Sequence, residues 1–221
     1  LAGFGFSLIG VPLASLLLNV KHVVPLCVLL GMITMIILAI QLKGHLDLRR
    51  LRALYLGLLP GIGVGTLLLK HLPDHLVEML LGTFLIILSL YNFFGHRRIK
   101  KLHPLWGAVA GFLSGSISAS VGGGGPPVVV YASISGGPRD EMKADLASFF
   151  VGMTTLTVVA HALGGLISSL VLKLLVISSP AALLGLALGS RCYGRLDSNS
   201  YRRLLYVILC ILGVMLLVRS F

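Results

Sequence analysis

Charged residues are scarce in this chain, and acidic residues are the scarcest. Of 221 residues only 11% are charged, with 7 acidic against 18 basic, whereas 57% are hydrophobic. A soluble domain usually carries about a quarter charged residues, so the composition excludes an ordinary soluble domain. The basic residues lie in short loops between apolar runs, which argues against nucleic-acid binding and is typical of cytoplasmic loops in membrane proteins.

Cysteines are few, and a nucleotide-binding loop is missing. The three cysteines, Cys27, Cys192 and Cys210, show no CxxC or His/Cys spacing, so we expect neither a metal site nor a disulfide. No GxxxxGK[ST] stretch occurs, which excludes the phosphate-binding loop of ATP-driven pumps. We therefore expect no cofactor. Because the first residue is Leu rather than Met, we expect further residues to precede it.

Long apolar runs, by contrast, are abundant. Runs of roughly 18 residues are typical of transmembrane helices, and there are too many here for a signal peptide followed by a soluble domain. We predict an all-α polytopic membrane protein with full spans at Val23–Gln41, Leu51–Leu69, Leu76–Phe94, Phe149–Ile167, Leu170–Leu188 and Leu204–Val218. We expect this multi-pass protein to lie in the lipid bilayer of a bacterial cytoplasmic (inner) membrane.

The two halves of the chain resemble each other. The stretch "LLGMIT" at 29–34 echoes "FVGMTT" at 150–155, and "GVPL" at 10–13 echoes "GPPV" at 125–128. We predict two homologous transmembrane repeats, 1–95 and 105–221, joined by a basic linker at 96–104. Weak internal symmetry of this kind is typical of secondary transporters.

Four glycines and two prolines interrupt one of the most apolar segments, "SVGGGGPPVVVY" at 120–131. Irregular backbone at bilayer depth is tolerated where it is buried in protein or lines a cavity. We predict a turn at 122–125 and a half-helix that begins at Pro126 and Pro127 and runs through Ser133. Gly10 and Pro12 would begin a matching half-helix, Leu13–Leu18. Helix N-termini offer free N–H groups and partial positive charge, which suit a small anion; close helix packing is the alternative.

The distribution of Lys and Arg distinguishes broken segments that cross the membrane from re-entrant ones. If both segments cross, the two sides receive 10 and 8 basic residues, which gives no topology signal. If both are re-entrant, one side receives only Lys21, Lys70, Lys173 and Arg219, and the other receives the remaining 14. The positive-inside rule favours the re-entrant arrangement. Each repeat then makes three full crossings, an odd number, so the repeats are inverted.

Polar residues near the break complete the predicted site. Serines precede the glycines at a spacing of two, and Thr154, Thr157 and His161 share one helix face. We predict that the anion is bound by Gly10, Pro12, Ser116, Ser118, Ser120, Gly122, Gly123, Gly124, Gly125, Pro126, Thr154 and Thr157. His161 would carry a coupled proton. The alternatives are serines that only bond neighbouring helices and a neutral, packed histidine.

The motifs resemble those of the sulfite exporter TauE/SafE family, also called toluene-sulfonate uptake permeases. The family's glycine-rich opening is similar to "AGFLSGSISASVGGGGPPVVV" at 110–130, and the first half offers "AGFGFSLIGVPLASLLL" without the GGG run. "GHLDL" at 44–48 and the glycine patterns at 61–72 and 185–196 are also similar. The resemblance implies transport of sulfur-containing anions such as sulfite, thiosulfate and sulfonates.

We therefore expect a secondary transporter, not an enzyme, that works by alternating access, with protons as an expected coupling ion. One alternative is a passive anion channel. Another is an intramembrane serine protease, because Gly115–Ser116 and "AHALGG" at 160–165 resemble segments of rhomboid proteases. The GxSG pattern that such a nucleophile needs is incomplete here. The exact anion, the direction of transport and the oligomeric state stay open.

Overall fold

The computed structural model describes residues 5–41, 48–93, 105–135, 139–192 and 198–220. Within these ranges the chain forms α-helices joined by short turns, so the predicted all-α fold is confirmed there. The helices are α1 Gly5–Ser15, α2 Val20–Gln41, α3 Leu48–His71, α4 Asp74–Phe93, α5 Leu105–Val121, α6 Gly125–Ser135, α7 Arg139–Leu163, α8 Ser169–Cys192 and α9 Ser198–Ser220. The predicted linker at 96–104 lies outside the described residues.

Each predicted span falls mainly on one of the long helices. Among the described residues, four stretches are long and apolar enough to cross a membrane: Leu51–His71, Asp74–Tyr91, Ala144–Leu163 and Ser169–Leu188. The span predicted at 149–167 extends too far, because α7 ends at Leu163. There Gly165 adopts a φ of 72° and the N–H of Leu166 bonds back to the carbonyl of His161, a glycine-terminated helix end.

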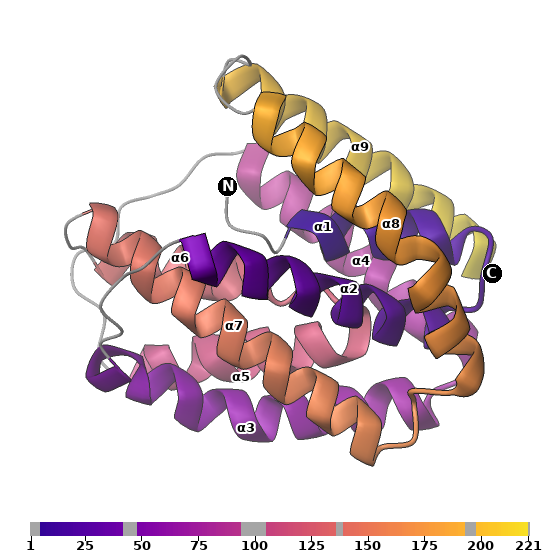
Figure 1. The fold of residues 1–221 in the computed structure, drawn as a ribbon, viewed down its shortest axis with the longest axis horizontal. Coiled ribbons are helices and arrows are strands. Elements are labelled where there is room, and N and C mark those ends of the chain that lie inside the picture. Colours follow the sequence, from indigo (N-terminus) through magenta and orange to yellow (C-terminus); the bar gives the residue numbers. More distant parts are fainter. Residues whose placement is uncertain (1–4, 42–47, 94–104, 136–138, 193–197, 221) are drawn as a thin grey trace.

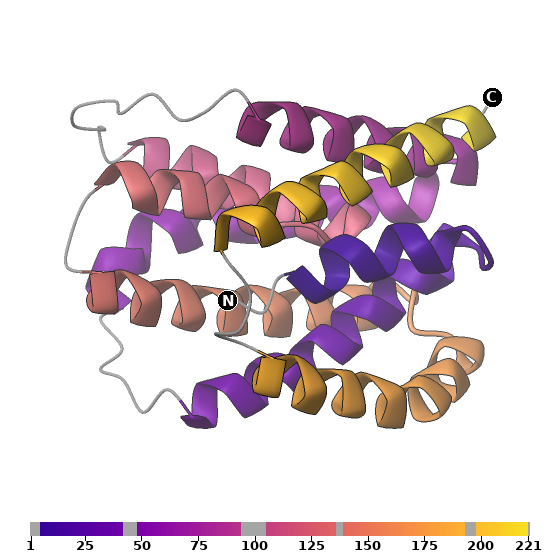
Figure 2. The same cartoon turned by 90° about the horizontal axis from the view of Figure 1, so that it is seen from above.

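The helices pack in pairs around a central contact. α3 packs along α5, and α4 packs along α9, while α2 and α7 lie side by side (Figure 1). The view from above shows α4 and α9 running along one edge of the molecule (Figure 2). The buried apolar side chains form two main clusters, one mostly on α1, α2, α4 and α9 and the other mostly on α3, α5 and α7.

Glycines allow α3 and α5 to approach unusually closely. A Cβ at Gly57 or Gly61 would overlap the backbone carbonyls of Ala108 and Phe112, and a Cβ at Gly111 would overlap the carbonyl of Leu54. Small residues at a spacing of four are the usual means by which membrane helices bring their backbones together. This close contact, the α3–α5 seam, fixes the position of α5. It thereby also fixes the position of the glycine turn at the end of α5.

The glycine run makes the chain turn back on itself. Gly122 has a φ of 76°, which favours glycine. A Cβ at Gly124 would lie 2.6 Å from Cβ of Ser118, and one at Gly107 would lie 3.0 Å from the hydroxyl of Tyr131. α6 therefore runs antiparallel to α5. The start of α5 and the end of α6 both lie at the left of Figure 1. The predicted turn and the helix after it are confirmed.

The half-helix predicted at 13–18 is wrong. α1 begins at Gly5 and ends at Ser15, with Pro12 inside it, and the chain then turns before α2 begins at Val20. The prediction assumed that proline marks the first helical turn. In membrane helices an internal proline is tolerated because neighbouring groups satisfy the freed backbone. Gly10 and Pro12 therefore lie within α1 and do not begin a helix.

Candidate functional site

A cavity of about 20 Å³ lies where the glycine turn meets the α2–α7 contact. Residues from four helices and the turn line it: Ser7, Val28, Gly31, Met35, Ser118, Gly122, Gly124, Phe150, Met153 and Thr154. A water molecule needs roughly 10–15 Å³ of such volume. The cavity thus has room for about one water, and its lining combines hydroxyls, bare backbone and apolar side chains without a charged group.

The structure brings together four of the predicted site residues. The cavity is lined by Ser118, Gly122, Gly124 and Thr154. Thr157 lies outside the lining, with its hydroxyl 3.4 Å from that of Ser118. The other predicted residues are off the lining: Gly10, Pro12, Ser116, Ser120, Gly123, Gly125, Pro126 and His161. Ser116 and Ser120 instead contact each other, because the Ser120 hydroxyl donates to the Ser116 carbonyl at 2.6 Å.

The hydroxyls of the cavity differ in how firmly they are held. Thr154 donates to the carbonyl of Phe150 at 2.7 Å, a strong bond within its own helix. Ser7 donates to the carbonyl of Cys27 at 3.4 Å, a long contact. Thr157 donates to Met153 at 2.7 Å, so Ser118 is the donor in its own 3.4 Å contact with Thr157. Ser7 and Ser118 are therefore the hydroxyls that can most easily turn toward a ligand.

The turn adds backbone donors. The N–H of Gly122 bonds to the carbonyl of Ser118 at 3.0 Å, and no described residue accepts a hydrogen bond from Gly123 or Gly124. Pro126 and Pro127 have no N–H, so the first turn of α6 contributes fewer donors than an ordinary helix N-terminus. The donors expected at the start of α6 thus belong mainly to the turn before it.

His161 holds the broken end of α5. It is 1% exposed, and its Nε2 lies 2.9 Å from the carbonyl oxygen of Ala119. A carbonyl only accepts, so Nε2–H is the donor. The residue that would bond to Ala119 in a continuous helix is Gly123, which lies beyond the break. His161 thus satisfies an orphan carbonyl, while its Nδ1 is buried without a partner among the described residues.

Helix α1 covers the glycine turn from the other side. A Cβ at Gly122 would lie 2.8 Å from a methyl of Val11 and 3.7 Å from Cβ of Ser7. A Cβ at Gly123 would lie 2.9 Å from Phe84 of α4 and 3.1 Å from Leu8 of α1. The turn is therefore enclosed by α5, α1 and α4, with α1 covering Gly122.

Sequence reasoning missed six residues of the lining: Ser7, Val28, Gly31, Met35, Phe150 and Met153. Most belong to segments that had already been noticed for another reason. Gly31 lies within "LLGMIT", and Phe150, Met153 and Thr154 lie within its echo "FVGMTT". The repeated segments are thus the two sides of the central contact between α2 and α7. That shared position was the available signal for the site.

Comparison with models of protein families gives a match over nearly the whole chain. The family model described as "Sulfite exporter TauE/SafE" matches residues 1–216, nearly the whole chain. No curated protein and no solved structure matches the chain.

Proposed function

Because the chain belongs to the TauE/SafE sulfite exporter family, whose members are membrane transporters of the sulfite-exporter type, we propose that it moves small sulfur-containing anions. Sulfite, thiosulfate and organosulfonates are the proposed substrates, and the bacterial cytoplasmic membrane is the proposed location. Transport rather than catalysis is the proposed activity.

The observation that supports the proposal is the small cavity at the helix break, which is lined by hydroxyls and bare backbone as well as apolar side chains. Broken helices near the bilayer midplane are a common means of building transporter sites, because they expose backbone groups to a substrate. In this chain the turn at Gly122–Gly124 and the hydroxyls of Ser7 and Ser118 face one space. The lining is neutral, so an anion would be held by N–H and O–H donors rather than by an ion pair.

An inverted repeat would explain how the site opens to both sides. α1 and α6 each have 11 residues, and Gly125 − Gly5 gives an offset of 120. α3 and α8 each have 24 residues, and Ser169 − Leu48 gives 121. Figure 1 draws α2 and α7 running in opposite directions. These offsets favour pairing Gly5 rather than Gly10 with Gly125, and they support alternating access between two inverted repeats, 1–95 and 105–221.

A carrier explains the small cavity better than a channel does. A passive anion channel needs a continuous aqueous path, whereas the cavity has room for about one water. A carrier needs no such continuous path. Proton coupling through His161 is part of the proposal, and its bond to Ala119 gives it a direct connection to the end of α5 beside the cavity.

Thermal stability of the purified protein, measured against a panel of anions, tests the proposal. The panel contains sulfite, thiosulfate, sulfate, taurine, isethionate, phosphate and chloride. An anion at about 100 times its Kd should raise the free energy of unfolding by about 2.7 kcal/mol. We expect one sulfur anion to stabilise the protein selectively, and Ser118→Ala to weaken that effect.

Ser133→Ala is the matched control, because Ser133 is an exposed serine on α6 whose hydroxyl donates to the carbonyl of Val130 within the same helix. It should respond to the anion as the unaltered protein does. Equal responses from both variants would move the site away from Ser118. No response to any anion of the panel would contradict the proposed substrate class.

A further inference from the structure

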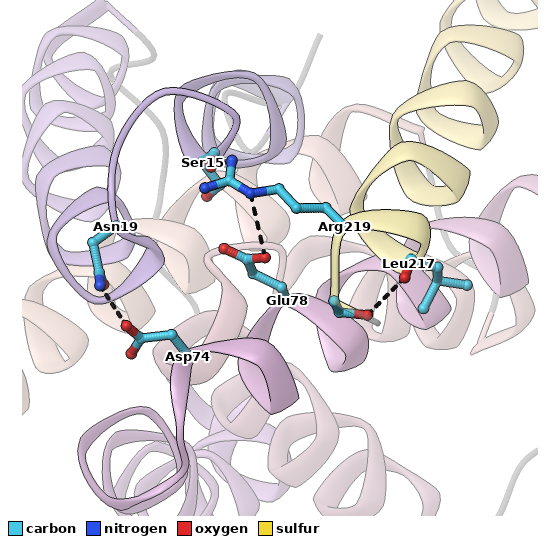
Figure 3. A network of polar contacts seen from close by, with 7 residues as sticks. Ser15, Asn19, Asp74, Glu78, Leu217 and Arg219 are labelled. Atoms are coloured by element: carbon cyan, nitrogen blue, oxygen red, sulfur yellow. Dashed lines mark hydrogen bonds and ion pairs between the residues drawn. The ribbon is translucent and has the colours of Figure 1, made fainter.

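The end of α1 is tied to α4 and α9 by an arginine. Ser15 is the last residue of α1, and its carbonyl is one of the four that a helix end leaves without an intrahelical partner. Arg219 Nη1, near the end of α9, donates to this carbonyl at 2.7 Å. Arg219 Nε also lies 3.9 Å from Oε2 of Glu78 on α4, as Figure 3 shows. Arg219 lies beyond residue 216, where the family match ends.

A second tie fixes the turn that follows α1. The side-chain amide of Asn19 donates to Asp74, and Lys21 Nζ lies 3.4 Å from Oδ1 of the same carboxylate. Asp74 and Glu78 are one turn apart on α4. Asp74 thus contacts the α1–α2 turn and the start of α2, while Glu78 pairs with the arginine that bonds the end of α1 (Figure 3).

These contacts lie at the place where the cavity would begin to open. α1 covers the glycine turn through Val11 and Leu8, and it supplies Ser7 to the cavity. The helix is only 11 residues long. A movement of α1 away from the turn would uncover Gly122, whose nearest neighbours are Val11 and Ser7, whereas Gly123 would still be covered by Phe84 of α4.

We propose that Arg219, Glu78 and the Ser15 carbonyl form a latch that keeps α1 closed over the glycine turn. Its release opens the cavity toward the α1–α2 turn. The latch rests on the proposed function only for the identity of the transported solute. The movement of α1 itself does not depend on which solute is carried.

Cys27 is a native reporter of this movement. It is buried on α2, and its Sγ lies 3.5 Å from the position of a Cβ at Gly10 of α1. Its reaction with N-ethylmaleimide, an uncharged reagent, would be followed in protein that carries Cys192→Ala and Cys210→Ala. We expect Arg219→Gln to speed this reaction roughly ten- to a hundredfold, the range that follows from losing a hydrogen bond to a charged group.

Two controls separate a latch from a general effect on stability. Lys70→Gln removes an exposed cation at the end of α3 and should leave the rate unchanged. Leu58→Cys, placed in a Cys27→Ala background, reports from a fully buried position on α3, and its rate should not change with Arg219→Gln. An unchanged Cys27 rate, or an equal rise at both cysteines, would overturn the latch.

The labelling is measured without any anion, so its outcome is independent of the substrate proposal. A faster Cys27 reaction together with a silent anion panel would keep the latch and remove the proposed substrates. An unchanged Cys27 rate together with a clear anion response would remove the latch and keep the proposed substrates.

Discussion

At the scale of single residues, His161 shows how a buried polar group can satisfy a broken helix. The ring nitrogen Nε2 bonds the carbonyl of Ala119, which the break at Gly122 leaves without its usual N–H partner. This contact supplies a structural reason for a histidine at this depth. The proposed proton coupling needs the same residue, so the two roles have to be separated by substitutions that keep or remove the donor.

Replacing His161 with Gln or Ala separates these roles. A Gln amide can donate to the Ala119 carbonyl, whereas Ala leaves that carbonyl unpaired. We expect His161→Ala to lower the free energy of unfolding by about 1–3 kcal/mol, and His161→Gln to lower it by less. Both variants should flatten the pH dependence of anion uptake in proteoliposomes, if the imidazole carries the proton.

His71→Gln is the control, because His71 is an exposed histidine at the end of α3 whose Nδ1 lies 3.1 Å from the carbonyl of Leu67. It should change neither stability nor the pH profile. If His161→Gln leaves the pH profile unaltered, His161 has no part in proton coupling. Its role is then the hydrogen bond to α5.

At the scale of helices, the α3–α5 seam is the contact that leaves the least room for a side chain among the described helices. α5 must stay in place because the glycine turn is its continuation, and the seam holds it by direct approach of two backbones. α8 is different. It exposes large apolar side chains such as Val176 and Ile177, as expected for a helix that faces lipid, and a Cβ at its Gly185 meets nothing within 4 Å.

These two environments predict opposite effects from the same substitution. Gly61→Ala places a methyl group against the carbonyl of Phe112 and forces the two helices apart, so we expect a loss of about 1–3 kcal/mol. Gly185→Ala is the matched control and should be neutral or slightly stabilising, since alanine favours helix over glycine. Thermal unfolding of the two variants in the same detergent compares them directly. Equal stability would show that the seam is looser than described.

At the scale of the whole molecule, the α5–α6 hairpin determines which helix ends share a side. α6 returns along α5, so α7 starts at the end of the molecule where α5 began (Figure 1). The turns at 16–19, 72–73 and 164–168 lie at the opposite end. Lys21 and Lys173 follow the first and the last of these turns, Lys70 precedes the middle one, and Arg219 lies near the end of α9. This is the arrangement that the uneven distribution of charge favours.

Labelling from one side of the membrane tests this topology. In protein without its native cysteines, Leu17→Cys lies in the α1–α2 turn, where Leu17 is 87% exposed, and Arg139→Cys lies at the start of α7. We expect an impermeant maleimide to label Leu17→Cys from outside intact cells, and Arg139→Cys only after lysis. Labelling of both from outside would contradict the re-entrant hairpin.

The sequence by itself determined the class of the protein and the position of its break. Apolar runs of fixed length predict helices whatever their neighbours are, and the glycine–proline run predicts a turn, because only glycine readily adopts the φ seen at Gly122. The sequence could not place Gly10 and Pro12, since a proline within a helix and one at its start look alike in a single chain.

Only the tertiary structure decided which residues share the cavity and what holds it closed. Ser7, Met35 and Met153 come from three helices, and nothing local marks their side chains as neighbours. Arg219 and Ser15 meet across 204 positions of sequence. Such contacts depend on how the helices pack, and packing is set by close approach along whole helices, as at the α3–α5 seam, rather than by any short pattern.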